Sequence, residues 1–190
     1  MYVKEIWRYP VKSMAGEALD AADITEHGID GDRIIQVRNG SGRILTARTR
    51  PGLLRHRAVL TANGDVLVDR RPWNTEQVAA EVAEAAGQGT RLVSSDAEDR
   101  FDILPLLVTT DGMFAAVGYD RRRFRPNLVI GGVDGLSERQ WEGAQLQKGR
   151  VLTPEEEELA NQERVDWWYR EVKKTTTGTW FADAKRDGLI

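Results

Sequence analysis

The chain has 190 residues, contains no cysteine, and has only two histidines, His27 and His56. Without a thiol there is no disulfide, no thiolate nucleophile, and no zinc or iron–sulfur site built on cysteine. Two histidines also argue against a histidine-rich metal site. A metal would have to be held by carboxylates, or arrive already bound to an organic ligand, so no metal-ligating residue is predicted.

Long apolar runs are absent too. The longest, ILPLLV from Ile103, is far shorter than the ~20 residues that a membrane-spanning helix needs. The amino-terminal stretch is charged from Lys4 onward and is typical of a strand, not a signal peptide. We therefore expect no membrane partner and a cytoplasmic location. A net charge of −3 argues against a nucleic-acid partner, so recognition of an anion would have to be local.

Short β-type runs separated by glycines and turns dominate the first two thirds of the chain. They predict a mainly β, α+β fold with a barrel or sandwich at its centre. The Asn63-Gly64 pair between two such runs predicts a hairpin turn. The expected strands are Tyr2–Arg8, Ala18–Ile24, Arg33–Arg38, Val66–Val68, Arg91–Ser94, Leu106–Thr109 and Asn127–Ile130.

Three helices are expected beside these strands. The first begins with a capping box of Asn74 and Gln77 and ends at Gly87. A short one covers SERQWEG, residues 137–143. The third begins at Thr153 and runs for about twenty residues, with acidic residues in its first turn. We therefore predict a β-barrel domain over residues 1–150 and a helical extension over residues 151–190 that packs on it.

Two polar clusters near the amino terminus could carry chemistry. The stretch YPVKSM places Lys12 and Ser13, an ammonium and a hydroxyl, directly after a proline. The stretch GIDGDR places Arg33 after two glycines that let backbone approach a ligand. Each also fits an ordinary solvated turn. Asp32 is expected to form a plain ion pair with Arg33 and to have a lowered pKa.

Two further clusters are rich in arginine. In LTARTR, strand alternation would place Thr46, Arg48 and Arg50 on one side, where they could equally form the solvent face of an edge strand. In RRRFRPN, residues 121–127, the proline predicts an extended Arg125, and Asn127 opens an apolar strand. Arginine suits bidentate recognition of phosphate, so this motif predicts a site for a small anionic or phosphorylated ligand instead of a solvated loop.

Taken together, YPVKS, GDR, LTAR and RFRPN, followed by a short W-x-G segment, resemble the MOSC family, the molybdenum-cofactor sulfurase C-terminal domain, with its N-terminal β-barrel part. The resemblance runs from Met1 to about Gly149. It implies a β-barrel fold that binds the molybdenum cofactor, a pyranopterin with a terminal phosphate. The residues it places on this ligand are Lys12, Ser13, Arg33, Arg125 and Asn127, with Arg48 and Arg123 as additions.

The chain departs from the family at a cysteine that members carry after the W-x-G segment. Sulfur transfer through a protein persulfide is thereby excluded, because the carrier atom is missing. One reading is a molybdenum-dependent oxidoreductase with a non-cysteine metal ligand and a redox partner protein, for which no catalytic residue is indicated. A second is a binding protein without redox turnover. A third is a repurposed metal-free scaffold whose arginine-lined pocket takes another anionic small molecule.

Overall fold

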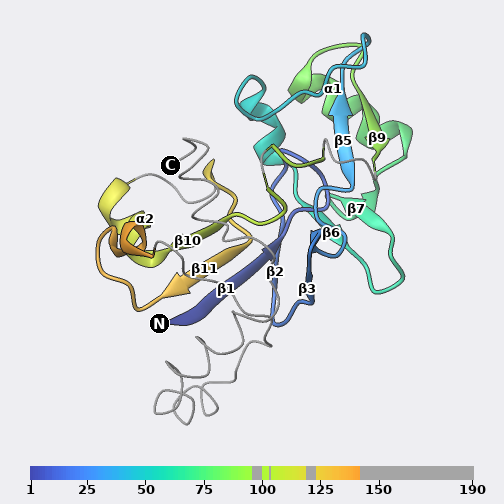
Figure 1. Cartoon of the computed structure of the whole chain (residues 1–190). Helices are drawn as coiled ribbons and strands as arrows, with labels where there is room; N and C mark the ends of the chain where they lie inside the picture. Colours follow the sequence, from blue (N-terminus) through green and yellow to red (C-terminus); the bar gives the residue numbers. More distant parts are fainter. Residues whose placement is uncertain (96–99, 103, 119–122, 142–190) are drawn as a thin grey trace.

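The computed structural model describes residues 1–95, 100–102, 104–118 and 123–141 (Figure 1). These residues form short strands in several sheets together with helices, so the predicted α+β class is confirmed. The strands are β1 (Tyr2–Arg8), β2 (Glu17–Leu19), β3 (Ile24–Thr25), β4 (Gly28–Ile29), β5 (Ile35–Arg38), β6 (Ala58–Leu60), β7 (Val66–Val68), β8 (Arg71–Pro72), β9 (Arg91–Ser94), β10 (Val108–Thr110) and β11 (Leu128–Gly131). The helices are α1 (Glu76–Ala86), α2 (Asp111–Val117) and the 3-10 turns η1 (Pro51–Arg55) and η4 (Ser137–Gln140).

The largest sheet has the strand order β10-β11-β1-β2. β1 is antiparallel to both its neighbours, and β10 runs parallel to β11. Every residue of β11 is buried, as expected for the apolar run that follows Asn127. Ile6 and Leu128 anchor a small hydrophobic cluster on this sheet, and α2 lies beside β10 and β11.

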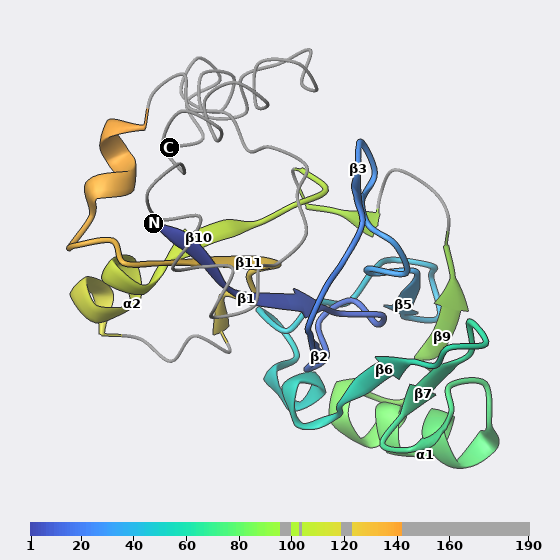
Figure 2. The ribbon, with the colours of Figure 1, turned by 90° about the horizontal axis from the view of Figure 1, so that it is seen from below.

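A larger hydrophobic core lies on the other side of the molecule (Figure 2). There β5 pairs with β9, β6, β7 and β8 form a meander, and α1 packs against η1. The helix buries Val78, Val82 and Ala86, which recur every four residues and therefore share one face. Leu53 of η1 is completely buried in the same core.

The segment from Tyr9 to Met14 links the two clusters. β1, which precedes it, contributes Ile6 to the smaller one, whereas Val11 and Met14 are fully buried in the larger one. Backbone hydrogen bonds from Lys12 N to Ile35 O (2.8 Å) and from Ile35 N to Pro10 O (3.0 Å) tie this segment to the start of β5. The polar residues between the anchors are therefore held on a rigid support.

Several predicted elements are confirmed, and others are wrong. The strand Arg91–Ser94 and the stop of α1 at Gly87 are as predicted. The helix cap is Thr75, whose hydroxyl accepts from Val78 N, so the capping box at Asn74 is wrong by one residue. The single strand predicted over residues 18–24 is two short strands, because β2 pairs with β1 and β3 pairs with β4.

Residues 46–50 form a turn instead of the predicted strand. The amides of Thr49 and Arg50 both donate to Thr46 O, at 3.0 and 2.8 Å. The short helix expected over residues 137–143 is a 3-10 turn, Ser137–Gln140. Helix α2 was not predicted, although Thr110 caps it through a 2.9 Å bond from Met113 N. The helix from Thr153 and the extension over residues 151–190 lie outside the described residues.

Within the described ranges, no helix has the length and apolar character required to cross a bilayer.

Candidate anion-binding site

Lys12 and Ser13 occupy the centre of a tight turn closed by a 3.2 Å bond from Met14 N to Val11 O. Ser13 has a φ of 74°, a value that favours glycine at this place in a turn. Its side chain is buried, and its hydroxyl has no hydrogen-bond partner among the described residues. A buried hydroxyl without a partner is costly in a folded protein, so it marks a position from which a ligand could accept or donate a hydrogen bond.

Arg33 is the hub that joins the amino-terminal turns to the RFRPN motif. Its Nη1 donates to Asp32 Oδ2 and to Asn127 Oδ1, the latter over 3.1 Å, and its Nη2 donates to Arg125 O over 3.4 Å. The guanidinium carbon also lies 5.4 Å from the centre of the Tyr9 ring, within reach of a cation–π contact. Arg33 thus fixes the positions of its neighbours as well as contributing charge.

The pKa of Asp32 differs from the sequence-based expectation. The predicted ion pair with Arg33 is present, but burial outweighs it, and the pKa of the Asp32 carboxyl is raised instead of lowered. The side chain is fully buried and accepts a 2.7 Å hydrogen bond from Tyr9 N. Asp32 therefore acts as an internal anchor that holds Arg33 next to Tyr9, shortly before the turn that carries Lys12 and Ser13.

Asn127 is also fully buried, and its side-chain amide both accepts and donates hydrogen bonds. Besides the bond from Arg33, its Oδ1 accepts from Leu107 N at 3.1 Å, and its Nδ2 donates to Trp7 O at 3.2 Å. These bonds join the ends of β1, β10 and β11. Asn127 consequently positions Arg33 and the motif around Arg125, and its own polar atoms are already satisfied.

Arg125 does not have the extended backbone that the following proline predicts. Its φ is 49°, in the left-handed region. Contacts on both sides hold this conformation, because Arg33 bonds to Arg125 O and the Tyr9 hydroxyl donates to Pro126 O over 3.0 Å. Tertiary contacts override the local preference here.

The Arg125 guanidinium is largely buried and has no hydrogen bond or ion pair within the part of the chain that the structure describes. Burial, and then the charge of Arg33, lower the pKa of this guanidinium from its usual value. Arginine nevertheless stays charged in proteins. A desolvated cation without an acidic partner is a natural position for a ligand anion.

Lys12 and Arg48 meet on one carboxylate. Lys12 Nζ lies 2.9 Å from Asp102 Oδ1, and Arg48 Nη2 pairs with Asp102 Oδ2. Burial opposes ionisation of Asp102, but the hydrogen bond and charge of Lys12, with the charges of Arg48 and Arg33, hold its pKa below the usual value. Asp102 also acts electrostatically on Arg125, so it lies among all these cations.

We call Lys12, Arg33, Arg48 and Arg125 the cation cluster. Among the described residues, its four positive charges face two carboxylates, Asp32 and Asp102, so positive charge is in excess there. The structure therefore brings together six of the seven residues predicted for the site: the cation cluster, Ser13 and Asn127. The seventh, Arg123, is exposed two positions before Arg125.

Backbone strain concentrates in the same place. Of the described residues other than glycine, five have positive φ, and three of them are Ser13, Arg33 and Arg125. The other two, Asp69 and Arg70, form the two-residue hairpin loop between β7 and β8. Strained backbone persists where the surrounding structure fixes it, and it recurs at ligand sites. Ser13, Arg33 and Arg125 each come from a different motif of the sequence.

Sequence reasoning missed Asp102 and the contacts of Tyr9. Nothing near Asp102 in the sequence marks it, because its two cationic partners are Lys12 and Arg48, far away in the chain. Arg50, expected beside Arg48, instead donates from Nε to Ala86 O over 2.7 Å, at the end of α1. The turn at residues 46–50 separates the two arginines, which strand alternation would have kept on one side.

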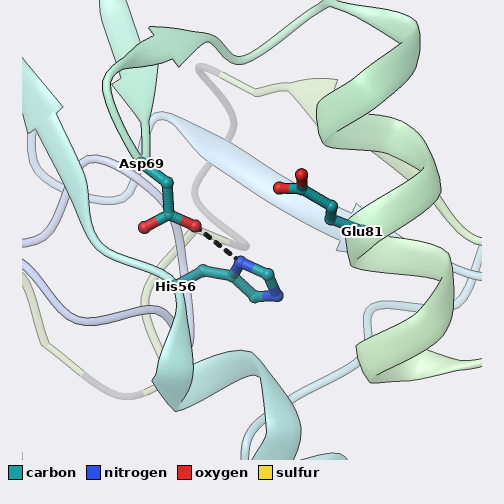
Figure 3. A group of neighbouring side chains, drawn as sticks. All are labelled: His56, Asp69 and Glu81. Carbon is teal, nitrogen blue, oxygen red and sulfur yellow. Dashed lines mark hydrogen bonds and ion pairs between the residues drawn. The ribbon is translucent and has the colours of Figure 1, made fainter.

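A second group of polar side chains, His56, Asp69 and Glu81, lies near the larger core (Figure 3). Their possible ligand atoms all lie within 4.8 Å of one another. His56 Nδ1 is 2.8 Å from Asp69 Oδ2, and Glu81 pairs with Arg71. Each carboxylate already has a partner, and the Arg71 cation adjoins the group. We therefore read it as a structural network that joins η1, the β7–β8 hairpin and α1.

Comparison with known families gives a match to the MOSC N-terminal beta barrel domain over residues 1–103. The match includes the motifs that carry Lys12, Ser13, Arg33 and Arg48, and it ends before the motif that carries Arg125 and Asn127. No curated protein matches the chain.

Proposed function

Because the chain belongs to the MOSC N-terminal β-barrel domain family, matched over more than half of its length, we propose that it binds the molybdenum cofactor or a related phosphorylated pterin. The observation that carries the proposal concerns the part of the chain that the structure describes: there the cation cluster has more positive than negative charge, and the adjacent Ser13 hydroxyl has no partner. A phosphate monoester has a charge near −2 at neutral pH and accepts several hydrogen bonds, so it would complement this group.

The residues divide into those that would contact the phosphate and those that support them. Lys12, Arg48 and Arg125 would hold the phosphate, with the Ser13 hydroxyl as a further hydrogen-bond partner. Arg33 would add charge while holding the backbone of Arg125 in place. Asn127 acts through Arg33, because its own amide is fully engaged within the fold.

When bound, the molybdenum cofactor would supply a redox-active metal that this chain cannot hold through cysteine. The residues described here fit its phosphate-bearing end. As the family expectation, we propose an oxidoreductase role in which the protein ligand of the metal is not cysteine. An electron-transfer partner protein would then be required.

The absence of cysteine favours a second candidate. In it, the scaffold is metal-free and the cation cluster binds another anionic small molecule. The two candidates share the phosphate-binding residues and differ in whether a metal and a pterin accompany the protein.

Elemental analysis for molybdenum, paired with fluorescence of the oxidised, extracted pterin, tests the proposal. The protein is expressed in a host that makes the cofactor, with the Arg125→Ala variant prepared in parallel. Near-stoichiometric pterin that falls in the variant supports cofactor binding at this site. Metal in the same ratio adds support for the oxidoreductase role, and pterin without metal favours binding or delivery. A folded protein with neither would overturn the proposal in favour of the metal-free alternative.

A further inference from the structure

Asp102 forms ion pairs with two members of the cation cluster, Lys12 and Arg48. Each of its carboxylate oxygens serves a different cation, Oδ1 that of Lys12 and Oδ2 that of Arg48. This is how a phosphate would use two of its oxygens. The carboxylate thus stands where the cluster would receive a ligand anion.

The partners of Asp102 differ in burial. The Lys12 side chain is 7% exposed, whereas those of Asp102 and Arg48 are 44% and 78% exposed. Asp102 can therefore turn into water at little cost to itself. A phosphate oxygen in the place of Asp102 Oδ1 would keep an anion beside the buried Lys12 ammonium.

From these contacts we propose that Asp102 is an intramolecular competitor for the anion site, which occupies Lys12 and Arg48 until a phosphate-bearing ligand displaces it. The inference rests on the proposed function of the cation cluster. A carboxylate attached to the chain competes at an effective concentration of roughly millimolar or more, so weak anions are excluded. A phosphate succeeds because it brings more charge, and it can also reach Arg125, which lacks an ion pair among the described residues.

Asp102→Asn separates this role from a structural one. The amide keeps the shape of the side chain and removes its charge. We expect the variant to bind inorganic phosphate about tenfold more tightly than the original protein, since one competing charge-assisted contact is lost. If Asp102 only supported Lys12 and Arg48, phosphate binding would weaken instead.

The measurement is a phosphorus NMR titration of the full chain with inorganic phosphate at low ionic strength. Asp65→Asn is the matched control, because Asp65 is exposed at the β6–β7 hairpin and its loss changes the net charge equally. Phosphate affinity in this variant should stay within about twofold of the original, the small effect of an exposed charge outside the cation cluster. Asp102→Ser, measured alongside, guards against a folding defect specific to asparagine, and it should also bind phosphate more tightly.

The outcomes separate the two claims. Tighter binding in both Asp102 variants, with the control unchanged, supports the competitor. Unchanged or weaker binding overturns it and leaves the anion site intact. Absence of phosphate binding in every variant also overturns it, and the pterin analysis then decides whether the proposed function falls as well.

Discussion

Arg33 Nη1 donates a 3.1 Å hydrogen bond to Asn127 Oδ1 from a position 94 residues earlier in the chain. This bond joins the GDR turn to the start of β11, so two motifs that are remote in sequence become one structural unit. Ser13, Arg33 and Arg125, three of the five described non-glycine residues with positive φ, belong to the same group. Variants of these residues should therefore separate stability from ligand binding.

Asn127→Ala should destabilise the protein strongly. The substitution leaves Leu107 N without its 3.1 Å acceptor and Trp7 O without its 3.2 Å donor, and it removes polar atoms of a fully buried side chain. We expect a loss of about 2–4 kcal/mol in the free energy of unfolding, measured by urea denaturation. Gln88→Ala, at an exposed position after α1, is the control and should change stability by less than about 0.5 kcal/mol. Equal losses in the two variants would contradict the role of the Asn127 amide.

Arg125→Ala should weaken ligand binding without destabilising the fold. The guanidinium is desolvated and unpaired among the described residues, so its removal should leave the unfolding free energy unchanged or raise it by about 1 kcal/mol. Affinity for the phosphorylated ligand should fall by about ten- to a hundredfold, the value of a charged hydrogen bond. Arg139→Ala removes an exposed arginine and serves as the control in the same titration and denaturation. A large loss of stability in Arg125→Ala alone would assign this side chain a structural role.

Ser13→Ala should stabilise the ligand-free protein. The buried hydroxyl has no partner among the described residues and therefore destabilises the folded state by about 1 kcal/mol or more. Its removal should recover this free energy. The gain should appear as a raised melting temperature, while affinity for a phosphorylated ligand falls. Ser13→Gly should stabilise by a similar amount for another reason, because glycine accepts a φ of 74°. A melting temperature that falls in both variants would show that the hydroxyl is satisfied within the fold.

Asp69→Asn should weaken the dependence of the free energy of unfolding on pH in the acid range. Burial opposes ionisation of Asp69, but hydrogen bonds from Arg57 N and from His56 prevail and lower the pKa of its carboxyl. A lowered acid pKa contributes stability above the unfolded value of 3.8, and this contribution is lost as pH falls through the folded pKa. At pH 7 we expect the variant to lose less than about 1 kcal/mol, since the carboxylate is partly exposed.

Urea denaturation at pH 6 and pH 3 checks this prediction. The difference between the original protein and Asp69→Asn should shrink toward pH 3. Asp65→Asn, which removes an exposed carboxylate in a neighbouring turn, should show no such trend. If the difference in unfolding free energy between the original protein and Asp69→Asn stays constant with pH, the Asp69 carboxylate does not contribute to the acid dependence of stability.

The sequence was sufficient for the fold class and for most strands. Arg91–Ser94 and the buried β11 follow from β-branched and apolar residues in short runs bounded by turns. It could not show the turn at residues 46–50, because alternation is seen equally in strands and in short loops. The left-handed Arg125 was equally hidden, since the local preference before proline points elsewhere and contacts with Arg33 and Tyr9 override it.

The cations that the structure brings together were all singled out in the sequence, whereas Asp102 was not. Lys12, Arg33 and Arg125 stand in motifs with glycine or proline neighbours, and these neighbours mark the motifs as turns in the sequence. Asp102 stands in no such motif, and its importance depends on a meeting with Lys12 and Arg48 that only the fold creates. The raised pKa of Asp32 depends likewise on complete burial, which a sequence does not show.

The strand order β10-β11-β1-β2 has a consequence for the boundaries of the domain. β1 pairs Tyr2 with Gly131, although the family match ends at residue 103. A fragment cut at that boundary would leave one side of β1 without its β11 partner and would expose Ile6, which Leu128 covers. During synthesis, the first strand must wait for residues 128–131 before its sheet can close. The family match therefore covers less of the chain than this sheet requires.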